Sequence, residues 1–186
     1  MRTKSFDQII TEIRAISTRN EIFLEEVPAP QKLAPFAFAL TADVELSPDD
    51  DEDSATGRFV LLHDPAGQEG WSGDFRCVTF VRAAVDQDMA NDPLLIDLGW
   101  SWFLESLKKE GCEFIAPSGT VTRVASASFG TLENRENDSE VEVRASWTPI
   151  NGNDMAAHVR AWLNLLEIAS GMPPIPQGVT QLSRHN

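Results

Sequence analysis

Residues 57–86 hold the pattern that most restricts how this chain can fold. Two apolar runs, 58–63 and 75–84, flank the turn-rich segment DPAGQEGWSGD. Its first four residues suit a type I turn, which favours Asp at the first position, Pro at the second and Gly at the fourth. The two runs are therefore predicted to be the strands of a long hairpin. Both carry apolar residues at odd and even positions, so we expect this hairpin to lie centrally in a sheet covered on both faces.

Other periodic segments predict helices and strands around this hairpin. Residues 36–46 alternate with a period of two, which is typical of a strand, and 140–148 alternate in the same way. The region 111–129 is β-prone, and residues 21–27 suit a short edge strand. Helices are predicted over 5–16, where Ser5 and Gln8 match a capping box, from Asp92-Pro93 to Gly111, and over 153–170.

This order of elements, α-(β)-βββ-α-ββ-α, predicts the α+β class. Short loops between successive strands favour antiparallel pairing, so we expect an antiparallel sheet of five to six strands with helices packed on one face. A chain of 186 residues suits a single domain, placed at 1–174. Residues 175–186 are rich in proline, glycine and polar residues, and are expected to form a poorly ordered tail.

Composition excludes several classes of function. The net charge is −14, so we expect neither a nucleic-acid partner nor an anionic membrane surface, both of which require a positive field. The first ten residues lack the apolar core of a signal peptide, and the protein is expected to be cytoplasmic. Two separated cysteines and three scattered histidines do not form a zinc motif, and the acidic run 49–53 lacks the ligand spacing of a calcium loop. No metal or cofactor is predicted.

The hairpin loop contains the first candidate site. His63 with Asp64 or Glu69 can supply a general base and its orienting carboxylate, or metal ligands, as in a small hydrolase or metal-dependent enzyme. The sequence has no nucleophile elbow or phosphate-binding loop beside them. The alternative is structural: Asp64 binds its own turn, His63 ends the strand, and Trp71 folds back over the hairpin. We favour the structural interpretation.

Arginines on the predicted strands form a second candidate site. These are Arg58, Arg76, Arg82, Arg123 and Arg144. Guanidinium groups suit bidentate pairing with anions, so a face that collects them can bind an anion or another small ligand. The alternative is that they pair with Glu140, Glu142 and other acids across the strands, and we favour this pairing.

Tryptophans form a third candidate. Trp100 and Trp102 are two residues apart, so they cannot share one narrow face of a helix. One of them, with Trp100 as the candidate, is expected to mark an interface with a second subunit. Trp71 is the candidate binding residue of the loop.

Five phrases of the sequence resemble an uncharacterised protein family of actinobacteria, described only as a domain of unknown function. They are PAPQKLAPFAFAL, ATGRFVLLHDPAGQEGW, DPLLIDLGWSW, GTVTRVASASFG and VEVRASWTP. The resemblance spans roughly residues 6–174 and implies an actinobacterial cytosolic protein, with no activity to carry over. In topology, the order of predicted elements is similar to the type III secretion chaperone fold, whose members are small acidic dimers that hold extended client segments.

These observations favour a non-catalytic function. The main hypothesis is a protein-binding or chaperone-like adaptor that forms a homodimer, because catalytic motifs are lacking and the second long helix carries surplus apolar surface. The alternatives are the enzyme centred on His63, Asp64 and Glu69, and an anion or small-ligand-binding domain that uses the strand arginines.

Overall fold

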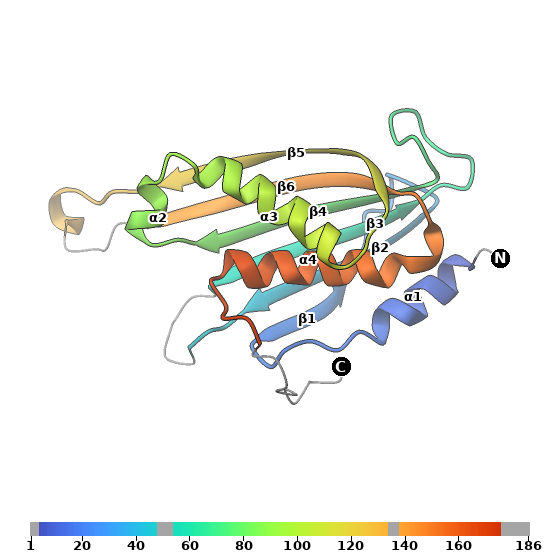
Figure 1. Ribbon diagram of the computed structural model, residues 1–186, viewed down its shortest axis with the longest axis horizontal. Helices are drawn as coiled ribbons and strands as arrows, with labels where there is room; N and C mark the ends of the chain where they lie inside the picture. The colour runs from blue at the N-terminus through green and yellow to red at the C-terminus, as the bar shows by residue number, and fades with distance from the viewer. Residues whose placement is uncertain (1–3, 48–53, 134–137, 176–186) are drawn as a thin grey trace.

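The computed structural model describes residues 4–47, 54–133 and 138–175. It is an antiparallel sheet of six strands in the order β1-β2-β3-β4-β6-β5 (Figure 1). The strands are β1 (Ile22–Val27), β2 (Phe36–Val44), β3 (Ala55–His63), β4 (Phe75–Ala84), β5 (Phe114–Ala125) and β6 (Ser139–Pro149). The helices are α1 (Phe6–Arg14), α2 (Gln87–Asn91), α3 (Leu95–Lys109) and α4 (Met155–Ala169). The predicted α+β class and the antiparallel sheet are confirmed.

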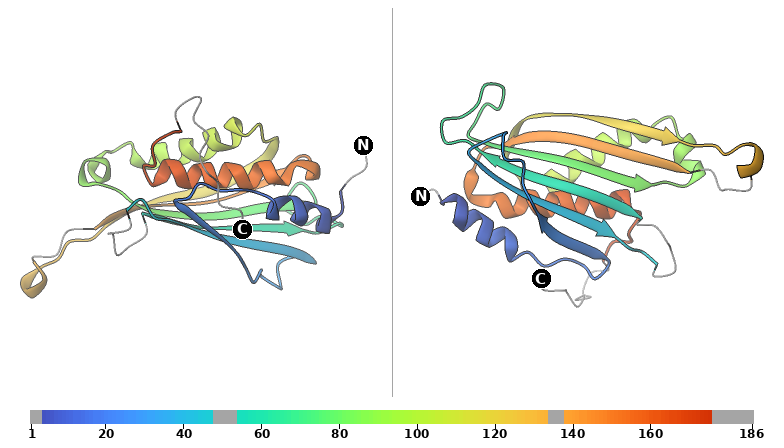
Figure 2. Two further views of the ribbon diagram at one scale, coloured as in Figure 1. Left: turned by 90° about the horizontal axis from the view of Figure 1, so that it is seen from below. Right: turned by 180° about the vertical axis from the view of Figure 1, so that it is seen from behind.

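Helices α1, α3 and α4 lie on the same side of the sheet (Figure 2). Helix α4 crosses the middle of the sheet and is buried along most of its length. A helix that is apolar around most of its circumference is stable only when other elements surround it, and here α1 and α3 flank α4. The core between these layers includes Phe59, Phe103, Trp147 and Trp162, each at most 2% exposed.

The predicted central hairpin is present. Strands β3 and β4 are the third and fourth of the six, and pair from Ala55↔Ala83 to His63↔Phe75. At the hairpin end, the Gly67 amide donates to the Asp64 carbonyl oxygen at 2.8 Å, which closes the expected turn. Gly67 adopts a φ of 71°, a conformation that glycine reaches without strain.

The helix ends agree with prediction at two places and differ at one. The capping box of α1 is formed by Ser5 and Gln8. Helix α3 ends at the predicted lysines, and Gly111 follows with a φ of 68°. The prediction that Asp92 caps this helix is wrong, because its carboxylate accepts from the Leu94 amide at 2.8 Å in a separate turn and the helix begins at Leu95. The short helix α2 was not predicted.

The face of the sheet opposite the helices is covered only in part. The proline-rich connector between β1 and β2 crosses this open face (Figure 2). It is held there by Arg58, which donates to the Pro28 carbonyl at 3.3 Å, and by Gln68, which donates to the Leu33 carbonyl at 2.9 Å. A small apolar cluster is buried beneath the connector, namely Ala39, Val60 and Leu62, with Trp71 packed against it. Across β4, β6 and β5 the open face has no helix over it (Figure 2).

Two predicted segments lie outside the described residues: the acidic run 49–53, and the C-terminal tail apart from Ile175. Within the described ranges, no helix combines the length and the apolar character that crossing a membrane requires.

Candidate functional site

His63 serves packing at the end of β3. Its ring stacks on that of Phe75, with centroids 4.0 Å apart and planes inclined by 16°. The ring of Phe6, in α1, is nearly parallel to it at 5.9 Å. The imidazole Nδ1 lies 3.1 Å from the carbonyl oxygen of Asp74. His63 therefore joins the hairpin end to α1, on the helix-covered face of the sheet.

The carboxylate of Asp64 is held by groups of its own loop. One oxygen of the Asp64 carboxylate accepts from the Ala66 amide at 3.1 Å, and the other accepts from the Gln68 amide group at 3.1 Å. Glu69 is exposed. Across the described ranges, no three His, Cys, Asp or Glu side chains are placed to hold a metal ion together. The structure therefore favours the structural interpretation of this loop.

The strand arginines separate into two groups. Arg82 donates through Nε to Glu140 at 2.7 Å, and Arg123 donates to the Ala90 carbonyl at 3.0 Å on the helix side. The other three, Arg58, Arg76 and Arg144, lie on the open face of β3, β4 and β6. Arg58 and Arg76 donate to neutral oxygens, and Arg144 makes one long contact with Glu142, so the expected pairing with acids does not explain their positions. The groups around these three arginines define the candidate site.

Arg58 and Arg144 flank an aromatic ring. The register of the sheet places Arg58 opposite Phe80, and Phe80 opposite Arg144. Neighbouring strands lie about 4.8 Å apart, so the backbones of the two arginines are about 10 Å apart. The Arg144 guanidinium carbon is 4.8 Å from the centre of the Phe80 ring, a cation–π contact. Its contact with Glu142 is long, at 3.4 Å, and the Arg144 side chain is 62% exposed, so this ion pair is weak.

The neighbouring row changes from apolar to hydroxyl side chains across the sheet. It runs from Val60 of β3 through Val78 of β4 and Ser146 of β6 to Ser118 of β5. The two serine oxygens lie 3.2 Å apart, so one hydroxyl donates to the other. The two rows together place positive, apolar and hydroxyl groups side by side.

Arg76 lies beside this row and is 8% exposed. Its guanidinium donates to four neutral oxygens: the Ala116 carbonyl at 3.0 Å and the hydroxyls of Thr148 at 3.0 Å, Ser118 at 3.1 Å and Ser146 at 2.7 Å. Burial lowers the pKa of this guanidinium, but arginine still keeps its proton in proteins. A buried charge is costly, and here hydrogen bonds to neutral groups satisfy it without a carboxylate.

A bulge in β5 positions two of these partners. The pairing of β5 with β6 shifts between Ile115 and Ser118, and Ala116 within the shift has a φ of 50°. This left-handed conformation is unfavourable for a residue with a Cβ. It directs the Ala116 carbonyl and the Ser118 hydroxyl to the same guanidinium. Bulges and strained residues of this kind are concentrated at functional sites.

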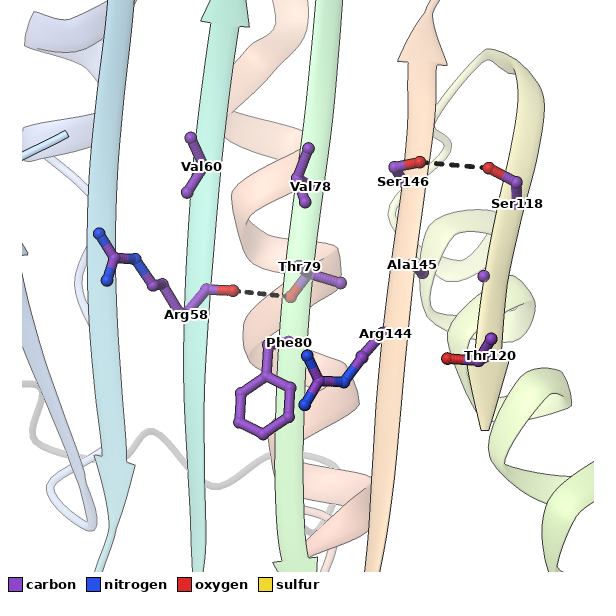
Figure 3. Close-up of a pocket in the computed structure, with 11 residues that line it drawn as sticks. Arg58, Val60, Val78, Thr79, Phe80, Ser118, Thr120, Arg144, Ala145 and Ser146 are labelled. Carbon is purple, nitrogen blue, oxygen red and sulfur yellow. Dashed lines mark hydrogen bonds between the residues drawn. The ribbon is translucent and has the colours of Figure 1, made fainter. Parts of the chain in front are cut away.

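These groups surround an open hollow of about 350 Å³ on the sheet surface (Figure 3). Its size is at the lower end for small-ligand sites. Figure 3 shows Arg58 and Arg144 on opposite sides of Phe80, with Ser118 and Ser146 at one end of the hollow. The eleven lining residues come from β3, β4, β5 and β6, and they are Arg58, Val60, Val78, Thr79, Phe80, Ser118, Gly119, Thr120, Arg144, Ala145 and Ser146.

The two candidate tryptophans lie outside the lining of this hollow. Trp71 is half-buried against Ala39, Val60 and Leu62, and its carbonyl accepts from the Thr148 hydroxyl, so it closes the hairpin as expected. Trp100 is half-buried on the helix side, where its ring is 5.0 Å from that of Phe103. Its indole lies under Gly119, on the opposite side of the sheet from the hollow.

Sequence reasoning identified two of the charged side chains of the hollow but missed its hydroxyl and aromatic groups. Ser118, Ser146 and Phe80 are ordinary strand residues, and no local motif distinguishes them. The available signal is the alternation of β6, which places Ser146 and Arg144 on the side opposite Val143 and Trp147. That alternation predicts a polar face, but the partners of that face depend on the register.

A family model described as "Protein of unknown function (DUF3000)" matches residues 2–180. Neither the curated proteins nor the solved structures contain a significant match to this chain. The expected likeness to type III secretion chaperones therefore gains no support from solved structures. The family match covers nearly the whole sequence, and it agrees with the resemblance to a family of unknown function. The chain is thus a member of the DUF3000 family.

Proposed function

We propose that this protein binds a small organic anion in the hollow on the open face of the sheet. One observation carries the proposal: none of the eleven described residues that line the hollow is acidic, although the chain has 29 acidic residues against 15 basic ones. Two arginines line this hollow and a third, Arg76, lies buried beside it. Local positive charge on a strongly acidic protein favours an anionic ligand, since the protein's overall field repels anions elsewhere.

The composition of the lining supports the same class of ligand. Val60, Val78 and Phe80 supply an apolar surface, while hydroxyl and guanidinium groups stand at its borders. Small-molecule sites in proteins combine a mainly apolar lining with a few polar groups that orient the ligand. Arginine beside apolar surface binds anions more strongly than arginine surrounded by water, because the local dielectric constant is lower.

Replacement of Arg144 tests this proposal. We expect Arg144→Gln to weaken the binding of an organic anion about tenfold, the effect of losing one charge-assisted hydrogen bond. Arg14→Gln is the matched control, because Arg14 is similarly exposed (59% against 62%), is also paired with a glutamate, and lies in α1. Isothermal titration calorimetry with sodium 1-naphthoate at constant ionic strength measures the effect. Equal affinities in the two variants would contradict the proposal.

A second candidate function is the protein-binding or chaperone-like adaptor. It is favoured by apolar side chains exposed at the start of α3: Leu94 is 58% exposed, Ile96 46% and Leu98 38%. Leu94 and Leu98 are four residues apart and share one side of the helix. Apolar groups gathered in this way are typical of an interaction surface. We propose a second copy of this chain as the partner, which corresponds to the expected homodimer.

Light scattering after size-exclusion chromatography tests this second candidate. At micromolar concentration we expect the mass of a dimer for the unmodified protein and that of a monomer for the double variant Leu94→Glu, Leu98→Glu. The replacement puts charges where burial would otherwise stabilise association by about 25 cal/mol per Å² of apolar surface. The double variant Asp88→Glu, Asp97→Glu is the control, since both positions are already acidic. A monomeric unmodified protein, or a dimer that persists in the leucine variant, would refute the proposal.

A further inference from the structure

We infer that the ligand of this hollow is a monocarboxylic acid with an apolar body, and that its carboxylate binds at the Ser118–Ser146 end. This inference rests on the proposed function and specifies its ligand class. The row of side chains described above is apolar at Val60 and Val78 and ends in the two serines. A ligand that lies along this row meets apolar surface with one end and hydroxyl groups with the other.

The hydrogen bonds of the two serines leave one donor for a ligand. Each hydroxyl has one hydrogen and two lone pairs. The Arg76 Nη2 donates to both oxygens, at 3.1 Å to Ser118 and 2.7 Å to Ser146. The 3.2 Å contact between the oxygens uses one hydroxyl hydrogen. The remaining hydroxyl hydrogen is therefore available to an acceptor in the hollow.

Arg76 makes this hydroxyl a stronger donor. A hydroxyl that accepts from a charged group is polarised, which strengthens the bond it donates in turn. The guanidinium is buried and held by four oxygens, so it keeps its position whether or not a ligand is present. Arg76 is thus a positioning residue that acts on the ligand through the serines.

Arg144 completes a site for two oxygens. It is two residues before Ser146 on the same face of β6, and its guanidinium lies beside the Phe80 ring, from which the flexible side chain can turn toward a ligand held at Ser146 (Figure 3). A carboxylate has two oxygens, one to accept from the free serine hydroxyl and one from Arg144. A phosphate monoester carries more charge and a third oxygen, and is usually held by backbone amides at a helix N-terminus or loop. The hollow offers one free serine hydroxyl and the Arg144 guanidinium, which match the two oxygens of a carboxylate.

The apolar end favours a ligand with a hydrocarbon body. Val60 is 8% exposed, and Val78 and Phe80 are half-buried, so this surface is already partly protected from water. A body that covers the valines and the ring removes the rest of this surface from water, which strengthens binding in proportion to the apolar area covered. Acetate and inorganic phosphate lack such a body.

Four probes test the ligand class by calorimetry on the full chain at constant ionic strength. They are 1-naphthoate, acetate, inorganic phosphate and the neutral 1-naphthalenemethanol. We expect 1-naphthoate to bind at least about tenfold more tightly than each of the others, because it alone has both the charge and the apolar body.

Two serine variants test the binding position. We expect at least one of Ser146→Ala and Ser118→Ala to weaken 1-naphthoate binding about fivefold or more, because one of the two hydroxyls supplies the free hydrogen to the charged ligand. Thr122→Ala is the control, because Thr122 is on β5 outside the lining of the hollow. Denaturation midpoints show whether each variant is folded, and only folded variants are compared.

The outcomes separate this inference from the proposed function. Tight 1-naphthoate binding that is weakened by the serine variants and unaffected by Thr122→Ala supports both. If anions bind in a manner that depends on Arg144, but acetate, phosphate or the neutral alcohol binds as tightly as 1-naphthoate, the ligand class is refuted and the proposed function stands. Unchanged binding in both serine variants refutes the position of the carboxylate. If none of the three anions binds, both proposals are refuted.

Discussion

Gly119→Ala is expected to destabilise the native state by about 3 kcal/mol, because a side chain at this position has no space. A Cβ on Gly119 would lie 2.1 Å from the Arg144 carbonyl oxygen and 2.9 Å from the indole ring of Trp100. The first contact is with backbone, which can move only if β5 separates from β6. The indole fills the other side, so rotating a single side chain does not relieve the clash.

Guanidinium denaturation of Gly119→Ala measures the effect on the free energy of unfolding. Thr122→Ala is the control, since Thr122 lies on the same strand and is exposed, and we expect it to change stability by less than about 1 kcal/mol. If Gly119→Ala is as stable as the unmodified chain, then β5 and β6 do not approach each other at Gly119 as closely as the structure shows.

The close approach at Gly119 also helps to form the hollow. Gly119 and Ala145 are opposite one another on β5 and β6, and both line the hollow. Their side-chain positions face the helices, so the floor of the hollow at this point is backbone. Trp100 supports the same strands from the helix side. Gly119 therefore contributes to both faces of the sheet. On one face it leaves space for Trp100 of α3, and on the other it lines the hollow.

The strands and helices could be predicted because their causes are local. Alternation fixes the face that a strand buries, and the segment from Asp64 to Gly67 fixes the turn of the central hairpin. The last helix was predicted over 153–170 from its apolar side, and it runs from Met155 to Ala169. The start of α3 was mispredicted because Asp92 and Pro93 suit a turn as well as a helix N-terminus, and local preference does not distinguish the two.

The candidate site could not be predicted from the sequence, because it depends on register between distant strands. Arg58 and Arg144 flank Phe80 only if both pairings of β4 have the observed register, and a shift by one residue would turn one arginine to the helix side. Arg123 shows what happens to an arginine whose position in the strand turns it to the helix side. It is a strand arginine like Arg144, but it is opposite Val141 and faces the helices. The alternation of β5 is too blurred to reveal this.

Closeness in the sequence was a poor guide to which side chains share the same surroundings. His63, Asp64 and Glu69 are clustered along the chain, yet His63 stacks between elements and Asp64 is held in its own turn. A strand places neighbouring side chains on opposite faces, and a turn binds its own polar groups. Sequence clustering is thus weaker evidence for a site in a sheet protein than alignment across strands.

Acidification is expected to destabilise the protein through one buried histidine. His158 of α4 is 2% exposed, and its Nδ1 accepts from the Nε1 of Trp147 at 2.9 Å. Burial lowers the pKa of His158 from 6.5 to about 4, although the nearby charge of Asp154 acts in the opposite direction. The lowered pKa means that the native state favours the neutral ring. Protonation of Nδ1 would also abolish the hydrogen bond from the indole.

The sign of the pH effect follows from proton binding. Between pH 6.5 and about 4, the unfolded chain binds a proton at His158 that the native state does not bind. Stability therefore falls as the pH falls through this range, by at most about 1.4 kcal/mol per pH unit and by about 3 kcal/mol in total. The contribution is fully present above pH 6.5. Glu167 acts in the opposite direction, because burial raises its pKa and the native state takes up its proton more readily.

The variant His158→Asn isolates the contribution of His158 from that of all other titrating groups. The Asn side-chain oxygen can accept from Trp147 as the ring nitrogen does, and it does not titrate. We expect the free energies of unfolding of the two proteins, measured by guanidinium denaturation from pH 7.5 to pH 4, to converge by about 3 kcal/mol as the pH falls. The variant is less stable at neutral pH, where the buried ring packs best, and it loses less on acidification. Parallel curves would show that His158 is as easily protonated in the native state as in the unfolded chain, and that the bond to Trp147 does not hold it neutral.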